Sequence, residues 1–214
     1  MNNTTGQLAF YFDQGRCTGC QTCVVACKDW NQIKPGPATY RELHDTEEGT
    51  FPNANVFMTI YSCNHCEHPA CIDACPYQAI YKRAKDGIVV INTEACQGAG
   101  ECKNACPYSA PQFPTDIQEN PTLPLNTPTK GHKATKCTMC WDRVAEGLVP
   151  ACVGSCLARA LDFGTLESLQ RKYPNAQTLK DGGTLKGFPM DDRGSDGRTL
   201  PKPTRPSFLF KPKS

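Results

Sequence analysis

Residues 16–30 read R-C-T-G-C-Q-T-C-V-V-A-C-K-D-W, a run in which four cysteines follow the spacing C-x2-C-x2-C-x3-C. The spacing recurs in three variants, one of which has Ala99 where a cysteine is expected. The four groups, in order, are Cys17, Cys20, Cys23 and Cys27; Cys63, Cys66, Cys71 and Cys75; Cys96, Cys102 and Cys106; and Cys137, Cys140, Cys152 and Cys156. Fifteen cysteines in 214 residues is far above ordinary usage, so their chemistry decides the fold.

The rest of the chain has little with which to build a large apolar core. Hydrophobic residues make up 39% of the sequence and aromatic residues 8%, whereas 17 residues are glycine and 18 are proline. A group bound to the cysteines is therefore expected to supply part of the stability. The formal net charge of +2 argues against non-specific nucleic-acid binding. No apolar run is long enough to span a membrane, and the polar residues 1–7 do not resemble a secretion signal.

Three kinds of cysteine chemistry compete. A disulfide framework is disfavoured because the number of cysteines is odd and the C-x2-C-x2-C run packs thiols too closely to pair without strain. A four-thiolate zinc site takes two C-x2-C knuckles separated by a spacer, which the first group does not provide. That group is typical of iron–sulfur proteins, in which three loop thiolates bind one cubane and the fourth binds the neighbouring cluster. The sequence therefore predicts iron–sulfur clusters, with a zinc-stabilised interaction scaffold as a remote alternative.

Short strands and helices are expected around the cysteine groups. Apolar runs predict strands at residues 8–13, 56–61, 87–92 and 160–164, and helix-compatible stretches lie at 23–30 and 71–74. The recurring order of strand, cysteine loop and short helix predicts an α+β fold. Residues 1–165 are accordingly interpreted as two fused modules like those of bacterial ferredoxins.

Proline usage indicates how the groups pair. In two-cluster proteins the cysteine groups pair, and proline commonly follows the last cysteine. Pro76 and Pro107 do so in the second and third groups, whereas Lys28 and Leu157 stand there in the first and fourth. This difference favours pairing motif 17–27 with motif 137–156, and motif 63–75 with motif 96–106.

Long connections and a tail complete the chain. Residues 31–55 and 111–136 are expected to be long irregular insertions, of the kind that often form functional surfaces. Residues 166–172 read as an amphipathic helix. This helix opens a second domain, residues 166–214, whose remainder reads as an extended tail that ends in a short apolar strand at 207–210. Because it is too polar to fold alone, this tail is expected either to dock on a partner or to be disordered.

Four phrases resemble one protein family. They are residues 16–30, S-C-N-H-C-E-H-P-A-C (62–71), K-C-T-M-C-W-D-R-V-A-E-G (136–147) and A-L-D-F-G (160–164). They are similar to the four-cluster iron–sulfur electron-transfer subunit, the beta or B subunit, of the dimethyl sulfoxide reductase family of molybdopterin oxidoreductases. The resemblance covers residues 8–165, and the tail matches it less clearly.

The resemblance implies four sets of metal ligands. They are Cys17, Cys20, Cys23 and Cys156 for cluster one; Cys137, Cys140, Cys152 and Cys27 for cluster two; Cys63, Cys66, Cys71 and Cys106 for cluster three; and Cys75, Cys96 and Cys102 for cluster four. This grouping agrees with the pairing that the prolines favour. Because Ala99 cannot bind iron, cluster four is expected to be [3Fe–4S] and the other three [4Fe–4S]; a cubane with a non-cysteine ligand such as Glu101 is the alternative.

The resemblance also implies a role and partners. The chain is expected to relay single electrons between a large molybdenum or tungsten pterin catalytic subunit and a quinol-side or soluble partner. A membrane quinol-binding subunit is a further expected partner, which would place the chain at the periphery of the cytoplasmic membrane, exported folded with its partner or else cytoplasmic. The alternative function is an equivalent subunit of a formate dehydrogenase, a hydrogenase or an aromatic hydroxylase or dehydroxylase.

The remaining polar residues suggest no active site. No Ser/His/Asp-type or paired-carboxylate constellation and no phosphate-binding glycine motif stands out. His65 and His68 flank Cys66, but a full set of four cysteines favours a role as loop neighbours rather than as ligands. Basic residues near the motifs are expected to offset the cluster charge; they are Lys28, Lys103, Lys133, Lys136, Arg143 and Arg159.

Overall fold

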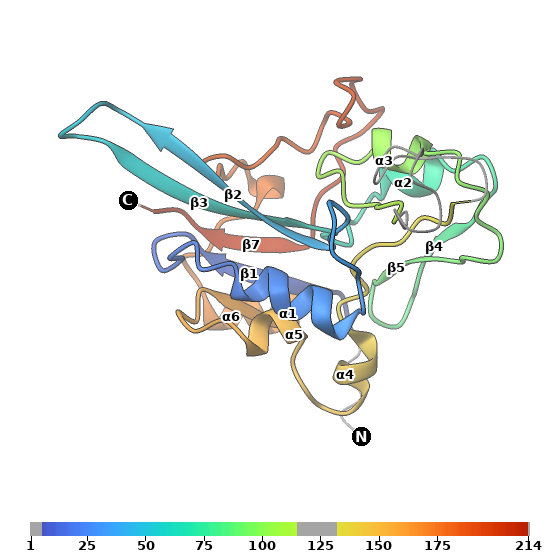
Figure 1. The fold of residues 1–214 in the computed structure, drawn as a ribbon, viewed down its shortest axis with the longest axis horizontal. Helices are drawn as coiled ribbons and strands as arrows, with labels where there is room; N and C mark the ends of the chain where they lie inside the picture. Colours follow the sequence, from blue (N-terminus) through green and yellow to red (C-terminus); the bar gives the residue numbers. More distant parts are fainter. Residues whose placement is uncertain (1–5, 115–131, 214) are drawn as a thin grey trace.

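The computed structural model describes residues 6–114 and 132–213, which build three small sheets linked by short helices (Figure 1). The mixture of short strands and short helices confirms the predicted α+β character. In the described residues, no helix is both long enough and apolar enough to cross a membrane.

Strand β1 (Leu8–Asp13) is the middle strand of the largest sheet and is buried along its whole length. Successive side chains of a strand point to opposite faces. The even-numbered side chains, from Leu8 to Phe12, belong to the main apolar core, which also includes cysteines. Ala9 and Tyr11 pack on the other face against helix α6 (Leu166–Lys172). Several cysteines and α6 thus lie on opposite faces of one strand.

Two strands from the C-terminal part of the chain flank β1. Strand β6 (Leu161–Thr165) is antiparallel to it, and strand β7 (Phe208–Lys211) is parallel to it. The phenylalanines of β7 are at most 2% exposed. The apolar end of the tail, expected to contact a partner or to be disordered, is therefore buried in this chain's own core.

The insertion expected to be irregular at residues 31–55 contains a regular strand. Strand β2 (Arg41–Glu48) pairs antiparallel with β3 (Asn55–Ser62), and their hairpin projects to the upper left of Figure 1. The expectation was wrong because half of the β2 residues are exposed and half are acidic, so its sequence lacks the apolar alternation of a half-buried strand. Of the other insertion, residues 115–131 lie outside the described part, and its ends meet at a bridge between Gln112 and Thr135.

Two pairs of helices carry the cysteine groups. Helix α1 (Thr22–Trp30) packs against α5 (Ala151–Gly154), and α2 (Ala70–Asp73) packs against α3 (Glu101–Asn104). Strands β4 (Ile80–Lys82) and β5 (Val89–Ile91) form a hairpin beside the second pair. Helix α4 (Trp141–Ala145) and a 3-10 turn at Leu179–Asp181 complete the described elements.

Candidate metal centres

The cysteines gather around cavities that join distant parts of the chain. Site 1 is a cavity lined by Cys17, Cys20, Cys23 and Cys156. Site 3 is a cavity lined by Cys63, Cys66, Cys71 and Cys106. In each cavity, three cysteines come from one group and the fourth comes from another.

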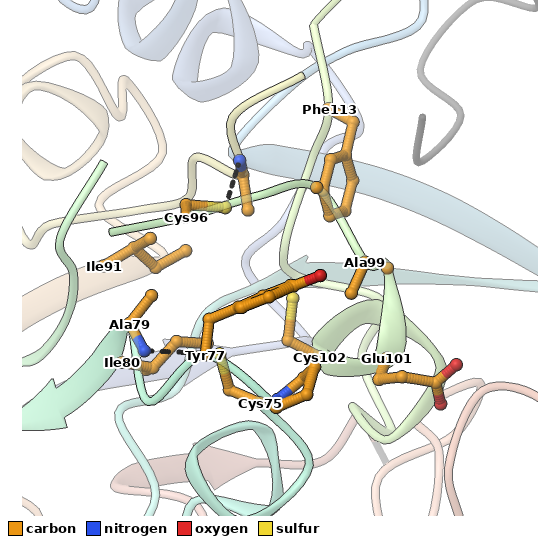
Figure 2. Close-up of a pocket in the computed structure, with 14 residues that line it drawn as sticks. Cys75, Tyr77, Ala79, Ile80, Ile91, Cys96, Ala99, Glu101, Cys102 and Phe113 are labelled. Carbon is orange, nitrogen blue, oxygen red and sulfur yellow. Dashed lines mark hydrogen bonds between the residues drawn. The ribbon is translucent and has the colours of Figure 1, made fainter. Parts of the chain in front are cut away.

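Site 4 is a cavity lined by Cys75, Cys96 and Cys102 (Figure 2). Ala99 lines it as well, at the position where a fourth thiol is missing. Figure 2 shows Ala99 and the sulfurs of Cys96 and Cys102 turned toward the same space. Three thiols and the methyl group of Ala99 thus line one cavity.

The remaining cysteines, Cys27, Cys137, Cys140 and Cys152, line none of these three cavities and interact electrostatically with one another, and they are called site 2. Burial raises the pKa of the Cys27 thiol to about 12, and nearby Cys152 and Cys140 contribute to the rise. The pKa of Cys137 is raised well above its usual value by burial and then by Cys27 and Cys152. These four thiols therefore form a fourth compact set.

Electrostatic contacts between thiols link the four sites in the order 1, 2, 3 and 4, a series called the line of sites. Burial is the largest cause of the raised pKa of Cys23, Cys137 and Cys106, and a thiol of a neighbouring site adds to each rise. Cys152 of site 2 acts on Cys23 of site 1, Cys63 of site 3 acts on Cys137 of site 2, and Cys102 of site 4 acts on Cys106 of site 3. At one end of the line, Cys20 of site 1 is exposed to solvent.

A local structure repeats at the four cysteine groups. In each group, a helix begins one residue before the third of the four cysteine positions, at Thr22, Ala70, Glu101 and Ala151. This repetition explains the common C-x3-C spacing, because one helical turn separates the last two cysteines of each group.

After the last cysteine, three groups share a turn. The third residue beyond Cys75, Cys106 and Cys156 has a positive φ of 49°, 46° and 49°, respectively. The next residue, an alanine each time, donates its backbone N–H to the cysteine sulfur, at 3.3 Å in the Ala79–Cys75 pair and 3.2 Å in the Ala160–Cys156 pair. The fourth group therefore forms the same turn as the second and third groups, although it lacks the proline that follows their last cysteine.

The first group departs from this turn. Helix α1 continues past Cys27 to Trp30, and Asn31 then donates from Nδ2 to the Cys27 carbonyl at 2.8 Å and to Cys27 Sγ at 3.7 Å. A side-chain amide thus replaces the backbone N–H that serves the other three groups.

The donor set fits iron–sulfur clusters. Most thiols have a raised pKa because burial disfavours the thiolate, so an inserted metal must displace their protons. Asn64 lines site 3, is 3% exposed, and its Nδ2 has no hydrogen-bond partner among the described residues. A buried N–H of this kind requires an acceptor, which a cluster sulfur in that cavity would supply.

The geometry does not suit a single ion. Among residues 6–114 and 132–213, no group of three or more Cys, His, Asp or Glu side chains could hold one metal ion. A tetrahedral zinc site draws its thiolates to about 2.3 Å from one point. Here the thiols surround cavities instead, as the several irons of a cluster require.

Two residues named as possible ligands are otherwise engaged. His65 Nδ1 accepts the backbone N–H of Val89 at 2.9 Å, whereas its buried Nε2 has no partner among the described residues. The Glu101 carboxylate accepts from Arg198 at 3.2 Å and points away from site 4 in Figure 2. Neither side chain completes a cysteine set in this arrangement.

Three basic side chains lie near the cysteines. Lys133 and Lys136 belong to the basic group expected from the sequence, whereas Arg41 was not expected there. Lys136 is 4% exposed and donates to the backbone carbonyls of Val89 and Cys137. Lys133 donates to the Cys96 carbonyl at 2.6 Å. Arg41 is 2% exposed and donates to Cys152 Sγ, yet it lies in the acidic insertion far from any cysteine motif, so spacing offered no signal for it.

Comparisons with known proteins agree with these sites. Residues 54–121 and 117–166 match the 4Fe-4S dicluster domain family, and residues 8–29 match a 4Fe-4S binding domain family. The sequence is 42% identical to the B component of the anaerobic dimethyl sulfoxide reductase of Escherichia coli (strain K12), over 79% of this chain and 78% of that one. It is 37% identical to the B component of the tetrathionate reductase of Salmonella typhimurium, over 74% and 58% of the two chains. It is 30% identical to the beta component of the perchlorate reductase of Dechloromonas aromatica, over 75% and 65%.

Proposed function

Since this protein belongs to the iron–sulfur B subunits of the dimethyl sulfoxide reductase family of molybdopterin oxidoreductases, we propose which cluster each cysteine site binds and which partner exchanges electrons at each end. Its function is electron transfer through iron–sulfur clusters, and the relatives favour this family over formate dehydrogenase, hydrogenase and hydroxylase assemblies. A bound cluster supplies reversible one-electron chemistry, and the protein supplies its ligands, burial and hydrogen bonds.

Each site holds one cluster in this proposal. The thiols of sites 1, 2 and 3 bind three [4Fe–4S] clusters, and those of site 4 bind the fourth. The observation that carries it is the line of thiol sets from exposed Cys20 to site 4. The α1–α5 and α2–α3 pairs support two fused ferredoxin-like modules within residues 1–165, one with sites 1 and 2 and the other with sites 3 and 4.

The cluster in site 4 is [3Fe–4S] in this proposal. Three thiols can hold three irons, and the corner that would face Ala99 has no protein ligand. The ion pair of Glu101 with Arg198 supports this choice over a carboxylate-bound fourth iron. A three-iron centre accepts electrons at a comparatively high potential, which suits the end of the line remote from Cys20.

The partners follow from the two ends of the line. A large molybdopterin catalytic subunit docks near Cys20 of site 1, and a quinol-side subunit or soluble carrier exchanges electrons near site 4. The assembly lies at the periphery of the cytoplasmic membrane. The outer surface of residues 174–206 contacts a partner, since only part of that stretch is buried in this chain.

The test is spectroscopy of the purified complex held at defined potentials. Iron and sulfide analysis combined with electron paramagnetic resonance should count three [4Fe–4S] clusters and one [3Fe–4S] cluster. Each should titrate as a one-electron centre and be re-oxidised by the substrate of the catalytic subunit. A colourless chain that contains zinc would overturn the proposal.

A further inference from the structure

Arg41 is the largest of the fully buried side chains and lies at the root of the β2–β3 hairpin. It pairs with Ser62 in the strand register, and Ser62 directly precedes Cys63. The hairpin therefore brings a permanent positive charge from an otherwise acidic strand to the cysteine sites.

The contacts of Arg41 point to the thiols. Its Nη2 donates to Cys152 Sγ at 3.5 Å, and its guanidinium carbon lies 4.6 Å from the centroid of the Phe10 ring. Among the described residues it forms no ion pair with an aspartate or glutamate. The side chain is thus held by one sulfur and one aromatic face.

A guanidinium this deeply buried requires negative charge nearby. Burial would lower the pKa of Arg41, but the thiols of Cys152, Cys137, Cys23 and Cys27 raise it above its usual value. Cys23 belongs to site 1, and the other three belong to site 2. Once these cysteines bind clusters as thiolates, the compensating negative charge comes from both sites.

We propose that Arg41 is a positioning residue shared by sites 1 and 2, which fixes Cys152 and raises the reduction potentials of both clusters. The proposal rests on the ligand sets given above. An electron added to a cluster increases its negative charge, and a buried cation stabilises that reduced form more than solvent-screened charges do. A hydrogen bond to a ligand sulfur acts in the same direction.

The contacts predict unequal effects on the four clusters. The cluster in site 2 responds most, since it has both the hydrogen bond and three of the four thiols. The cluster in site 1 responds less, through Cys23. The clusters in sites 3 and 4 keep the reduction potentials that they have in the parent protein.

The experiment compares three variants of the protein in its complex. Arg41→Met removes the charge and the donor while retaining much of the length. Arg41→Lys retains the charge. Arg171→Met is the matched control, because Arg171 is exposed and its ion pair is with Glu167 on α6. Iron content and potentiometric titrations followed by electron paramagnetic resonance are the measurements.

In Arg41→Met, the reduction potential of the cluster in site 2 should fall, and that of the cluster in site 1 should fall less. The reduction potentials of the clusters in sites 3 and 4 should stay unchanged. Arg41→Lys should restore part of each shift, and Arg171→Met should match the parent chain. Intact clusters with unchanged potentials, or an equal shift in all four, would overturn the inference, and so would iron loss in Arg41→Lys. If the parent chain has no iron–sulfur signals, the proposed function itself fails.

Discussion

Phe12 of β1 lies opposite Phe210 of β7 in a parallel ladder, and both side chains are fully buried. Strands from opposite ends of the described sequence thus pair beside the cysteine sites. Because Phe12 also lines site 1, this pair links the packing of the tail to the integrity of a metal centre.

Replacing Phe210 by alanine should destabilise the chain by about 3–5 kcal/mol, the usual cost of truncating a buried phenylalanine. Phe51→Ala is the control, because Phe51 at the tip of the hairpin is 94% exposed and its truncation should have little effect. Chemical unfolding followed by circular dichroism measures both. Equal stabilities of the two variants would show that β7 does not support the core.

Gln78 has a positive φ and its side chain is exposed, so the backbone conformation rather than packing determines which residues fit at this position. Gln78→Val should cost about 1–2 kcal/mol, because a β-branched residue is strained in this region, whereas Gln78→Gly should be tolerated. Unfolding midpoints of the two variants test the turn after Cys75. A valine variant as stable as the glycine variant would show that residue 78 does not adopt a positive φ in this turn.

Removing the iron should abolish cooperative unfolding. The proposed ligand sets tie together segments as distant as those of Cys17 and Cys156, and metal-dependent domains lose their fold with the metal. The measurement is the thermal melt of a chelator-treated sample beside one treated with iron-saturated chelator. A stripped chain that keeps a native-like circular dichroism spectrum and a sharp melt would contradict this expectation.

Asn64→Leu should lower the potential of the cluster in site 3, because it removes the buried N–H that has no other acceptor among the described residues. Asn53→Leu makes the same change at an exposed position of the hairpin loop and should leave all potentials unchanged. Redox titration of the complex distinguishes the two variants. If the potential in site 3 stays the same, Asn64 does not donate to the cluster.

Ala99→Cys should convert the cluster in site 4 from [3Fe–4S] to [4Fe–4S], because the new thiol faces the cavity beside Cys96 and Cys102. The near-isotropic resonance of the oxidised three-iron centre should then vanish. Ala84→Cys adds a thiol at an exposed position in the turn between β4 and β5 and should retain that resonance. A parent complex that is silent when oxidised but has the iron of four complete cubanes would refute the assignment.

Much of the local structure could be predicted from the sequence. The strand at residues 8–13 and the helix at 166–172 were predicted with the bounds that the structure has, because their apolar patterns match the periods of strand and helix. Strand β2 was missed because its exposed, acidic face has no such pattern. The apolar tail segment was recognised as a strand but not as a neighbour of β1, since a parallel pairing leaves no turn signal in the sequence.

The spacing of the cysteines by itself determined the chemistry, because thiols two and three residues apart on a loop and a helical turn can serve only a few kinds of metal centre. Tertiary structure decided which thiols face one cavity, where the amide of Asn64 points, and that Arg41 lies between two sites. Local spacing constrains only neighbours along the chain. Contacts between residues as far apart as Arg41 and Cys152 arise from the packing of the whole protein, and a buried charge there acts strongly because little solvent screens it.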